Sequence, residues 1–349
     1  MTAGPGEVPF EGGVMRYTVP GYAHRRGEHC GSGAMRNLLA FRGILLSEPM
    51  CFGLGSGAGF LYLPAYPVPP RVAFHGRIME LERALCGVLG IPFPERPEPD
   101  GDAGWARARE AVLAGNPVLV NTDLAFLDYF DTKTHFSGHR VVLIGFDDEA
   151  GEAHLSDSEW DAPQAVPIAS LSRSRSSDVP PYPMENRWCV VAPDGPLRPI
   201  AEAVPAALRK NAGEMLSAPE AGVSGVAGMR RAARELPGWP DMTPEWAFAA
   251  RFGYQVIEKR GTGGGFFRRL YARYLEEASA VCPPVADAGL PRAMVGVADG
   301  WTGIAALLKE ISESKDRGAF RRAGEMLLRQ ADAEETFWRT AARAATSCS

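Results

Sequence analysis

The chain has 349 residues, enough for two domains, and its 46% hydrophobic and 23% charged residues are typical of a globular protein. A net charge of −5 argues against nucleic-acid binding through phosphate neutralisation, and no run of about 18 apolar residues is present to span a membrane. Residues 1–7 lack the basic start and the apolar core of a signal peptide, so we expect a cytoplasmic location.

The first half of the chain has the pattern of a mixed domain of helices and strands. Apolar residues at helical spacing predict helices, the clearest at 31–43, 75–90 and 105–114. The run 141–146 is apolar on both faces, which indicates a strand inside a sheet. Further strands are predicted at 118–120, 153–156 and 187–192.

The composition changes at residues 193–199, where prolines and a glycine indicate a linker. Only helical patterns follow, at 200–217, 224–236, 243–253, 265–280, 300–314 and 317–345. We therefore predict an α+β fold, with a catalytic domain over residues 1–195 and a mostly helical C-terminal domain over 200–349.

Cys30 stands where a glycine-rich turn enters the predicted helix 31–43. A helix N-terminus carries partial positive charge and free N–H groups, which favour a thiolate and can hold an oxyanion. We expect Cys30 to be a nucleophile and Cys348 to lie in a frayed tail. The other four cysteines are expected to be inert: Cys51, Cys86, Cys189 and Cys282. No pair has CxxC spacing, and we expect no disulfide framework in a cytoplasmic protein.

His139 opens the buried strand 141–146, and a hairpin turn near residue 150 returns the chain to the same end. Asp157 and Asp161 fall there, and an odd-length loop would place them on the face of His139, whereas a two-residue loop would not. We favour His139 as the base and Asp157 as the acid that orients it, with His135 and Asp161 as alternatives. The order Cys, His, Asp is that of papain-like folds. A zinc site at His135 and His139 is disfavoured, because a strand rather than a helix follows them.

Other polar residues are candidates for contact with substrate or with an oxyanion. Gly31 and His29 adjoin the nucleophile, Glu48 precedes a proline, and Asn121 ends a buried strand. Residues 261–265 form a glycine-rich loop before a predicted helix that carries Arg268. We expect this loop, with Gly263 and Arg268, to hold a phosphate or to cover the cleft. A glycine hinge between two helices is the alternative. Three further residues are candidates for the same contacts. His24 and Glu28 closely precede Cys30, and Asp123 lies at the same strand end as Asn121.

Taken together, these motifs resemble the N-terminal domain of the butirosin biosynthesis protein H family. The resemblance is carried by residues 29–39, 46–57 and 135–147, together with Asp157. That domain is similar to bacteriocin-processing C39 peptidases, which have a papain-like fold. Residues 261–278 resemble a helical domain of unknown function that is often fused to it.

The resemblance implies an acyltransferase of antibiotic assembly that uses a cysteine nucleophile. Such an enzyme moves an acyl group from the 4'-phosphopantetheine arm of an acyl carrier protein, or from CoA, to a small-molecule amine, without a metal or other cofactor of its own. C39 peptidases carry a glutamine for the oxyanion six positions before the cysteine, where this chain has His24, so a protease is less expected. A cyclase, a thioesterase or amide hydrolase, and a non-catalytic papain-like binding protein remain alternatives. The oligomeric state stays open, with a homodimer as one alternative.

Overall fold

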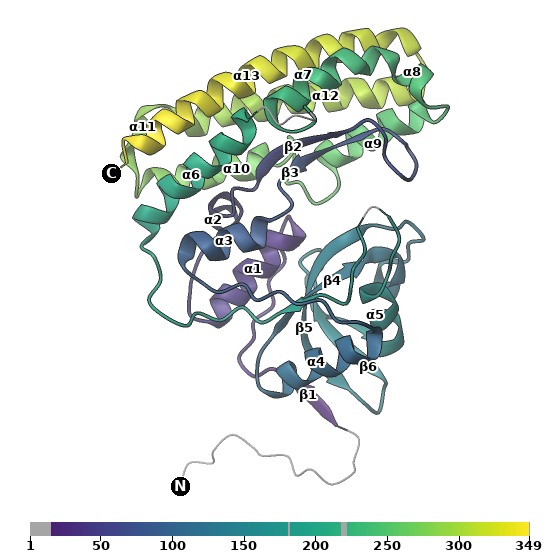
Figure 1. The fold of residues 1–349 in the computed structure, drawn as a ribbon, viewed down its shortest axis with the longest axis vertical. Coiled ribbons are helices and arrows are strands. Elements are labelled where there is room, and N and C mark those ends of the chain that lie inside the picture. Colours follow the sequence, from purple (N-terminus) through teal and green to yellow (C-terminus); the bar gives the residue numbers. More distant parts are fainter. Residues whose placement is uncertain (1–14, 181, 218–221, 349) are drawn as a thin grey trace.

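The computed structural model describes residues 15–180, 182–217 and 222–348, with a sheet at one end of the molecule and a layer of helices at the other (Figure 1). The first part holds a six-stranded antiparallel sheet of order β7-β6-β5-β4-β8, with β1 paired to β5. The expected α+β class is therefore confirmed. Its strands are β1 (Arg16–Thr18), β4 (Val118–Asp123), β5 (Ser137–Asp147), β6 (Glu152–Ser156), β7 (Gln164–Pro167) and β8 (Trp188–Cys189).

Strand β5 is apolar on both faces because helices cover both. Val142 and Ile144 face α1 (Cys30–Phe41), which supplies Leu38 to the same core. Val141 and Leu143 belong to a second core, covered by α4 (Gly101–Leu113) and α5 (Ile168–Arg175). Apolar side chains in alternation on a buried strand give this two-sided packing. Helix α1, which begins at Cys30, is thus fixed against the centre of the sheet.

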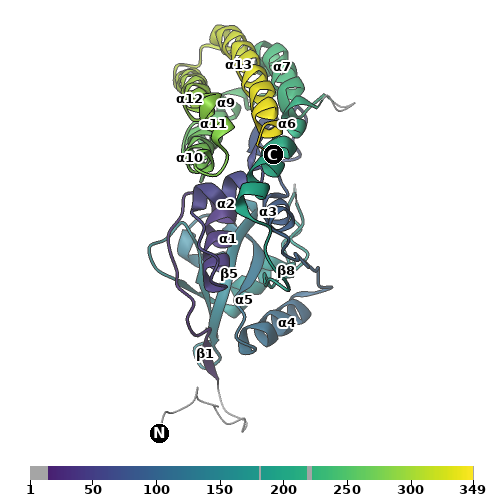
Figure 2. The ribbon, with the colours of Figure 1, turned by 90° about the vertical axis from the view of Figure 1, so that its left-hand side faces the viewer.

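Two short helices and a hairpin connect α1 to the rest of the molecule. They are α2 (Glu48–Leu54), α3 (Leu81–Leu89), β2 (Ala58–Leu63) and β3 (Ala73–Arg77). Figure 2 shows α1, α2 and α3 between the sheet and the helical layer. The sequence predicted one helix over 75–90, which is wrong at its start, since β3 runs to Arg77 and α3 begins at Leu81. The apolar residues after 77 have helical spacing, and this pattern hid the strand formed by residues 73–77.

The C-terminal half is helical, as expected, and the predicted helix 300–314 begins earlier, at Leu290. None of the helices in the described residues is long and apolar enough to cross a membrane. The helices are α6 (Ile200–Leu216), α7 (Gly225–Glu235), α8 (Trp239–Met242), α9 (Trp246–Glu258), α10 (Arg268–Ser279), α11 (Pro283–Asp287), α12 (Leu290–Ser314) and α13 (Phe320–Thr346).

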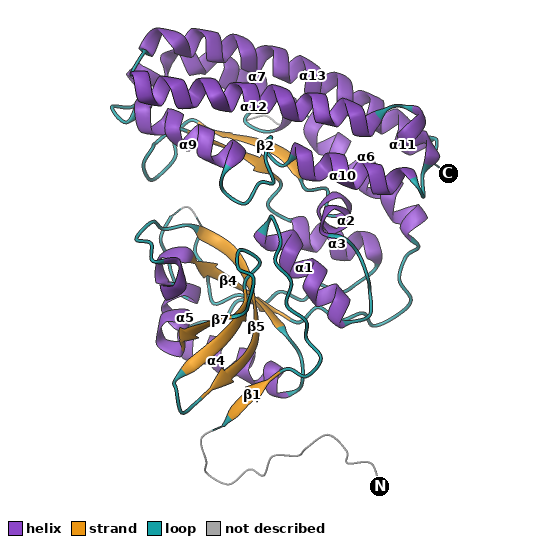
Figure 3. Ribbon diagram, turned by 180° about the vertical axis from the view of Figure 1, so that it is seen from behind, coloured by secondary structure: helices purple, strands orange, loops and turns teal. Residues whose placement is uncertain are grey.

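The hairpin β2–β3 packs into the helical layer although it comes from the first 77 residues (Figure 3). Phe60 and Phe74 contact the rings of Phe266 and Trp301, at centroid distances of 5.8–6.5 Å. One hydrophobic cluster therefore joins α1, the hairpin and the C-terminal helices. The predicted division into 1–195 and 200–349 stays a prediction.

The structure corrects our expectation for two of the cysteines. Cys282 and Cys348 form a disulfide, with Cα atoms 5.5 Å apart, which ties the end of α13 to the segment before α11. We expected a frayed tail at Cys348, but α13 continues to Thr346 and holds that residue in place. The two cysteines are 66 residues apart, so their spacing in the sequence gives no sign of the pairing.

Candidate active site

Cys30 is the first residue of α1, and the cap of that helix is built by its neighbour. His29 is the N-cap, and its Nδ1 accepts a hydrogen bond from the Ser32 N–H at 3.2 Å. Capping of this kind holds the backbone that leads into the helix. Cys30 itself is only 8% exposed, at the positive end of the helix dipole. The sulfur is therefore placed where a thiolate is favoured.

His139 lies beside Cys30 and is held by Asp157. The Nε2–H of His139 donates to Asp157 Oδ2 at 2.7 Å, because a carboxylate can only accept. Asp157 Oδ2 also accepts from the Tyr129 hydroxyl at 2.9 Å, and its Oδ1 accepts from the Glu159 N–H at 3.1 Å. Since Nε2 is used by Asp157, Nδ1 is the ring nitrogen that remains for Cys30. The structure thus brings the three residues of the predicted triad together.

A β-bulge sets the relative orientation of His139 and Asp157. The loop between β5 and β6 covers residues 148–151, an even number, which alone would place the two side chains on opposite faces. The register shifts between Leu143 and Gly145, so Ile144 is an extra residue that restores the shared face. Strand register is therefore a condition for this hydrogen bond.

Electrostatics at Cys30 favour an ion pair. Burial alone would raise the pKa of the Cys30 thiol, but the neighbouring imidazole of His29 and a hydrogen bond with His139 outweigh it and hold that pKa well below its usual range. Burial would lower the pKa of His139, but Asp157 and Cys30 raise it well above the usual value. Burial likewise opposes ionisation of Asp157, and His139 nevertheless lowers its pKa. A thiolate next to an imidazolium is the resulting state.

The other free cysteines of the described residues behave in the opposite way. Burial raises the pKa values of Cys51, Cys86 and Cys189, in the last case to about 12. All three lie in the hydrophobic core. A buried thiol without a positive neighbour stays protonated and inert.

The alternatives for the base and the acid lie elsewhere. His135 Nδ1 is 2.7 Å from Asp123 Oδ2, and this carboxylate also accepts from the Ser177 hydroxyl at 2.8 Å. Asp161 is an exposed residue whose nearest ionic partner is Arg26, at 3.3 Å. His135 and Asp161 therefore belong to separate clusters, and neither replaces its counterpart beside Cys30.

Two histidines near Cys30 differ in whether a ring nitrogen remains available for a further hydrogen bond. His24 uses both ring nitrogens, Nδ1 with the Ser156 hydroxyl at 2.8 Å and Nε2 with the Trp160 carbonyl at 2.9 Å. His29 uses Nδ1 as an acceptor, so its Nε2 carries the proton in the neutral ring. That Nε2 is buried and has no hydrogen-bond partner in the described part of the chain. Of the two, His29 is the one with a donor to offer an oxyanion.

Glu48 holds the loop before the nucleophile. Its Oε1 accepts from the His29 N–H at 2.8 Å, the Glu28 N–H at 3.0 Å and the Ser32 hydroxyl at 3.1 Å. Its Oε2 forms an ion pair with Arg36 at 3.5 Å. Because both oxygens are occupied in this way, Glu48 positions Cys30 and is poorly placed for the substrate contact that we expected.

The glycine-rich loop 261–265 lies against the nucleophile loop. A Cβ added at Gly263 would lie 2.6 Å from Glu28 Oε2, so the two segments are in close contact. Arg273 of α10 pairs with Glu28 Oε1 at 2.6 Å. Phe267, directly after the loop, contacts the His29 ring edge-on at a centroid distance of 5.5 Å. The loop thus covers the residues next to Cys30, in keeping with the second of our two expectations for it.

The structure corrects our expectation for Arg268. Its side chain is fully buried, and its Nε lies 2.7 Å from Glu334 Oε1. Its Nη1 donates to the carbonyls of Gly76 and Phe266, each at 2.8 Å. A guanidinium committed to the core in this way does not reach a phosphate at the cleft. The sequence placed Arg268 on the first turn of a helix but gave no sign of which face is buried.

The sequence analysis missed two charged residues beside the nucleophile. Arg140 follows His139 and lies 3.6 Å from Glu82 Oε1 and 2.6 Å from Glu95 Oε1. A Cβ added at Gly31 would lie only 2.3 Å from Glu82 Oε1, which places this carboxylate against the residue after Cys30. Asn121, one of our expected residues, pairs with Arg140 across β4 and β5. Glu82 is on α3, and no local signal in the sequence connects that helix to Cys30.

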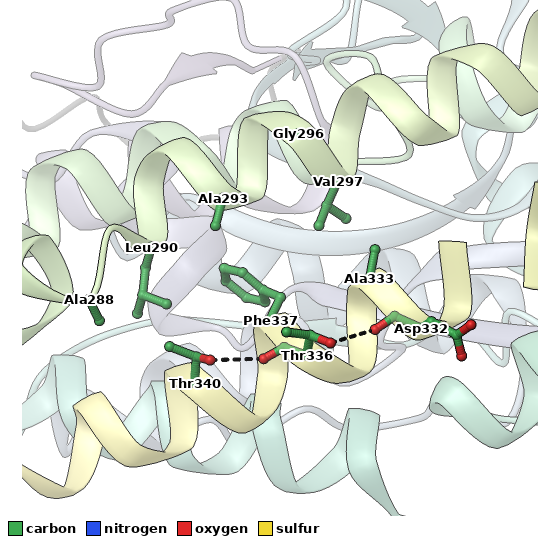
Figure 4. Close-up of a pocket in the computed structure, with 10 residues that line it drawn as sticks. All are labelled: Ala288, Leu290, Ala293, Gly296, Val297, Asp332, Ala333, Thr336, Phe337 and Thr340. Carbon is green, nitrogen blue, oxygen red and sulfur yellow. Dashed lines mark hydrogen bonds between the residues drawn. The ribbon is translucent and has the colours of Figure 1, made fainter. Parts of the chain in front are cut away.

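Two grooves open on the described surface. One, of about 740 Å³, lies beside the nucleophile loop and is lined by residues that include Arg25, Arg26 and Glu28. The other, of about 500 Å³, lies between α12 and α13, where Val297 and Phe337 face each other and Thr336 bonds within its own helix (Figure 4). The residues that line the second groove are all different from those that line the first.

Each half of the chain matches a known protein family. Residues 29–158 match the family described as butirosin biosynthesis protein H, N-terminal, a span that contains Cys30, His139 and Asp157. Residues 169–341 match a domain of unknown function, DUF4872. A search of curated proteins finds no match.

Proposed function

The chain belongs to the butirosin biosynthesis protein H family through its N-terminal domain, and we propose that it is a cysteine-dependent acyltransferase of natural-product biosynthesis. It moves an acyl group from a carrier-protein or CoA thioester, through an acyl-enzyme at Cys30, to an amine. The observation that carries the proposal is the position of Cys30 at a helix N-terminus, beside a His139 ring that is hydrogen bonded to Asp157. The lowered pKa of Cys30 and the raised pKa of His139 agree with a thiolate and an imidazolium. That combination activates a sulfur nucleophile at neutral pH.

In the first step the Cys30 thiolate attacks the carbonyl carbon of the donor thioester. The oxyanion that forms accepts hydrogen bonds from His29 Nε2–H and from the backbone N–H of Gly31, both next to the sulfur. The bond between carbon and pantetheine sulfur then breaks, and His139 gives its proton to that leaving sulfur. One thioester replaces another, so this step needs no metal or ATP.

In the second step the amine attacks the acyl-enzyme. A carbon–nitrogen bond forms, the bond to the Cys30 sulfur breaks, and His139 takes one proton from the nitrogen. The products are an amide, the thiolate and the imidazolium, so the starting ion pair is restored. Asp157 keeps the ring oriented through both proton transfers.

The groove beside the nucleophile loop supports the choice of donor. Its lining holds three arginines, Arg25, Arg26 and Arg36, and two glutamates, Glu28 and Glu48, so cations outnumber anions there. An acidic carrier protein, or the phosphate of its pantetheine arm, is attracted to such a surface. In this proposal these arginines take the role that we expected of Arg268.

Intact mass spectrometry with an acylated carrier protein tests the proposal. We expect an acyl adduct on the wild-type chain, absent in Cys30→Ser, which is converted to an amide when an amine is added. Release of free acid at all amine concentrations would show a hydrolase instead, and an intramolecular product would show a cyclase. A wild-type chain that never gains the acyl mass, or a Cys30→Ser variant with undiminished turnover, would overturn the proposal.

A further inference from the structure

Three buried polar atoms, two at the first turn of α1 and one on the sheet face that α1 covers, have no hydrogen-bond partner among the residues that the structure describes. They are His29 Nε2, Glu82 Oε1 and Asn121 Oδ1. More than about nine in ten buried polar groups in native proteins are hydrogen bonded, so three such atoms in this part of the molecule need an explanation. One of the three is a donor and two are acceptors.

The Glu82 carboxylate packs against Gly31, the residue that follows Cys30. Glu82 is 2% exposed, and its Oε1 lies in the space that a Cβ at Gly31 would take. Its ionic partner, Arg140, is 3.6 Å away and makes its short contact, 2.6 Å, with Glu95 instead. The glycine at position 31 is therefore what leaves room for this carboxylate beside the sulfur.

Asn121 lies on the same side of the sheet as Glu82. It is directly opposite Arg140 in the register of β4 and β5, and such pairs point to the same face. Leu119 and Val142, two residues away from each, pack in the core that α1 covers. Arg140 thus stands between Glu82 and Asn121, on the face of the sheet that leads to the nucleophile.

From this juxtaposition we propose that Glu82 and Asn121 form the acceptor subsite of the proposed acyltransferase, and that it takes a primary alkylamine. The inference rests on the proposed function. The two oxygens accept the two N–H bonds of the neutral amine and leave its lone pair free to attack the carbonyl carbon. The negative charge of Glu82 also draws the protonated amine from solution before it loses a proton to water.

The three orphan atoms match the tetrahedral intermediate of aminolysis. The donor, His29 Nε2–H, meets the oxyanion, and the two acceptors meet the nitrogen that attacks. His139 takes one proton from that nitrogen as the bond to Cys30 breaks, so each group has one role. Glu82 and Asn121 orient the amine and exchange no proton in this scheme.

The test separates acylation of Cys30 from capture of the acyl group. Wild type, Glu82→Gln and Asn121→Ala are acylated by an acyl carrier protein and then mixed with propylamine, and amide and free acid are quantified by mass spectrometry. The acylation rate of each protein is measured separately, so that capture is compared from equal amounts of acyl-enzyme. The propylamine concentration that captures half of the acyl-enzyme should rise tenfold or more in both variants, which corresponds to about 1.4 kcal/mol of lost binding.

Glu80→Gln is the control, because Glu80 flanks the same helix as Glu82 but is exposed and pairs with Arg83. Its half-capture concentration should stay near that of wild type. An equal rise in Glu80→Gln, or no rise in Glu82→Gln, overturns the subsite. Calorimetric titration of unacylated wild type and Glu82→Gln with propylammonium gives a second readout, which does not depend on acyl transfer. Equal affinities there would also overturn the subsite, whereas the proposed function fails only if Cys30 gains no acyl group.

Discussion

Two imidazoles act on the Cys30 sulfur from different elements. His29 caps the helix that Cys30 begins, and His139 reaches the sulfur from the central strand β5. Both lower the pKa of the thiol against the effect of burial, which acts in the opposite direction. A thiolate that is stable below neutral pH is the expected consequence.

Alkylation by iodoacetamide tests this state directly. Because the pKa of Cys30 is lowered, its thiolate is lost only when the pH falls below that pKa, so the wild-type rate should be nearly constant from about pH 6 to 8. In His139→Ala the alkylation rate at pH 6 should be lower than that of wild type. It should then increase about tenfold per pH unit as the pH approaches the ordinary thiol pKa near 8.5. A wild-type rate at pH 6 no faster than that of free cysteine would favour a non-catalytic binding protein. Cys30→Ser controls for alkylation of other cysteines.

Asp157→Asn keeps the shape of the acid and removes its charge. The raised pKa of His139 depends on Asp157, so the variant should lose the imidazolium and the proton that the leaving sulfur needs. We expect acylation of Cys30 to slow by about 10²–10⁴-fold, the usual contribution of general acid–base catalysis. Asp161→Asn is the control, since that residue is exposed and pairs with Arg26, and its rate should match wild type. Equal loss in both variants would contradict the assignment.

At the scale of residues, short-range signals were sufficient to select the three residues that the structure brings together. Cys30 is marked by its glycine-rich turn and His139 by the strand that it opens, and the structure joins both with Asp157. Glu82 could not be found in this way. It comes from α3, and its approach to Gly31 depends on how three elements pack. Arg268 was misassigned for the same reason, because burial of one helix face is decided by tertiary contacts.

Helix α2 acts on the active site through one carboxylate. Glu48, in its first turn, accepts hydrogen bonds from the N–H groups of Glu28 and His29 and thereby fixes the cap of α1. Charge-assisted hydrogen bonds to backbone N–H groups are among the stronger polar contacts in proteins. The position of the sulfur therefore depends on α2 as well as on α1.

Glu48→Gln turns one accepting oxygen into a donating amide group that faces other donors. We expect the free energy of unfolding to fall by about 3 kcal/mol, because buried donors lose their acceptor and Arg36 loses its ionic partner. Urea unfolding followed by circular dichroism measures this. Glu80→Gln removes an exposed pair with Arg83 and should change stability by less than about 0.5 kcal/mol. A Glu48→Gln variant as stable as Glu80→Gln would show that the hydrogen bonds and the ion pair of Glu48 contribute little to stability.

At the scale of elements, periodicity located most helices and the central strands, but not the register between them. The bulge at Ile144 has no sequence signature, yet it decides whether His139 and Asp157 share a face. The hairpin β2–β3 was also missed, because its partners are helices from the other end of the chain. Local patterns cannot report a contact whose two sides are more than a hundred residues apart.

The whole molecule shares one core across the predicted domain boundary. Phe60 and Phe74 of the hairpin contact Phe266 and Trp301, and a Cβ at Gly53 would fall within the ring of Tyr274. We therefore expect the fragment 1–195 to expose this apolar surface and to aggregate or to bind a hydrophobic dye, unlike the full chain. Size-exclusion chromatography and dye fluorescence test this. A soluble fragment 1–195 with a cooperative unfolding transition would contradict it and would support independent domains.

Arg268 joins the same parts of the molecule from within. It pairs with Glu334 of α13 and donates to the Gly76 carbonyl of the hairpin, and the indole N–H groups of Trp301 and Trp338 donate to the same Glu334. Arg268→Met leaves a buried carboxylate without its cation, which should cost about 3–5 kcal/mol of stability.

The two indoles donate to different oxygens of Glu334, so Glu334→Gln keeps an acceptor for one of them and removes the charge. It should therefore restore part of the stability lost in Arg268→Met. The double variant should therefore be more stable than the sum of the two single changes predicts, as residues in one buried network are coupled. Urea unfolding of all four proteins gives this coupling. If Arg268→Met were within about 1 kcal/mol of wild type but slow in acylation, the guanidinium would be free of the core, and its role as a phosphate ligand would return. The buried network predicts the reverse: a large loss of stability, and an acylation rate close to wild type in the protein that remains folded.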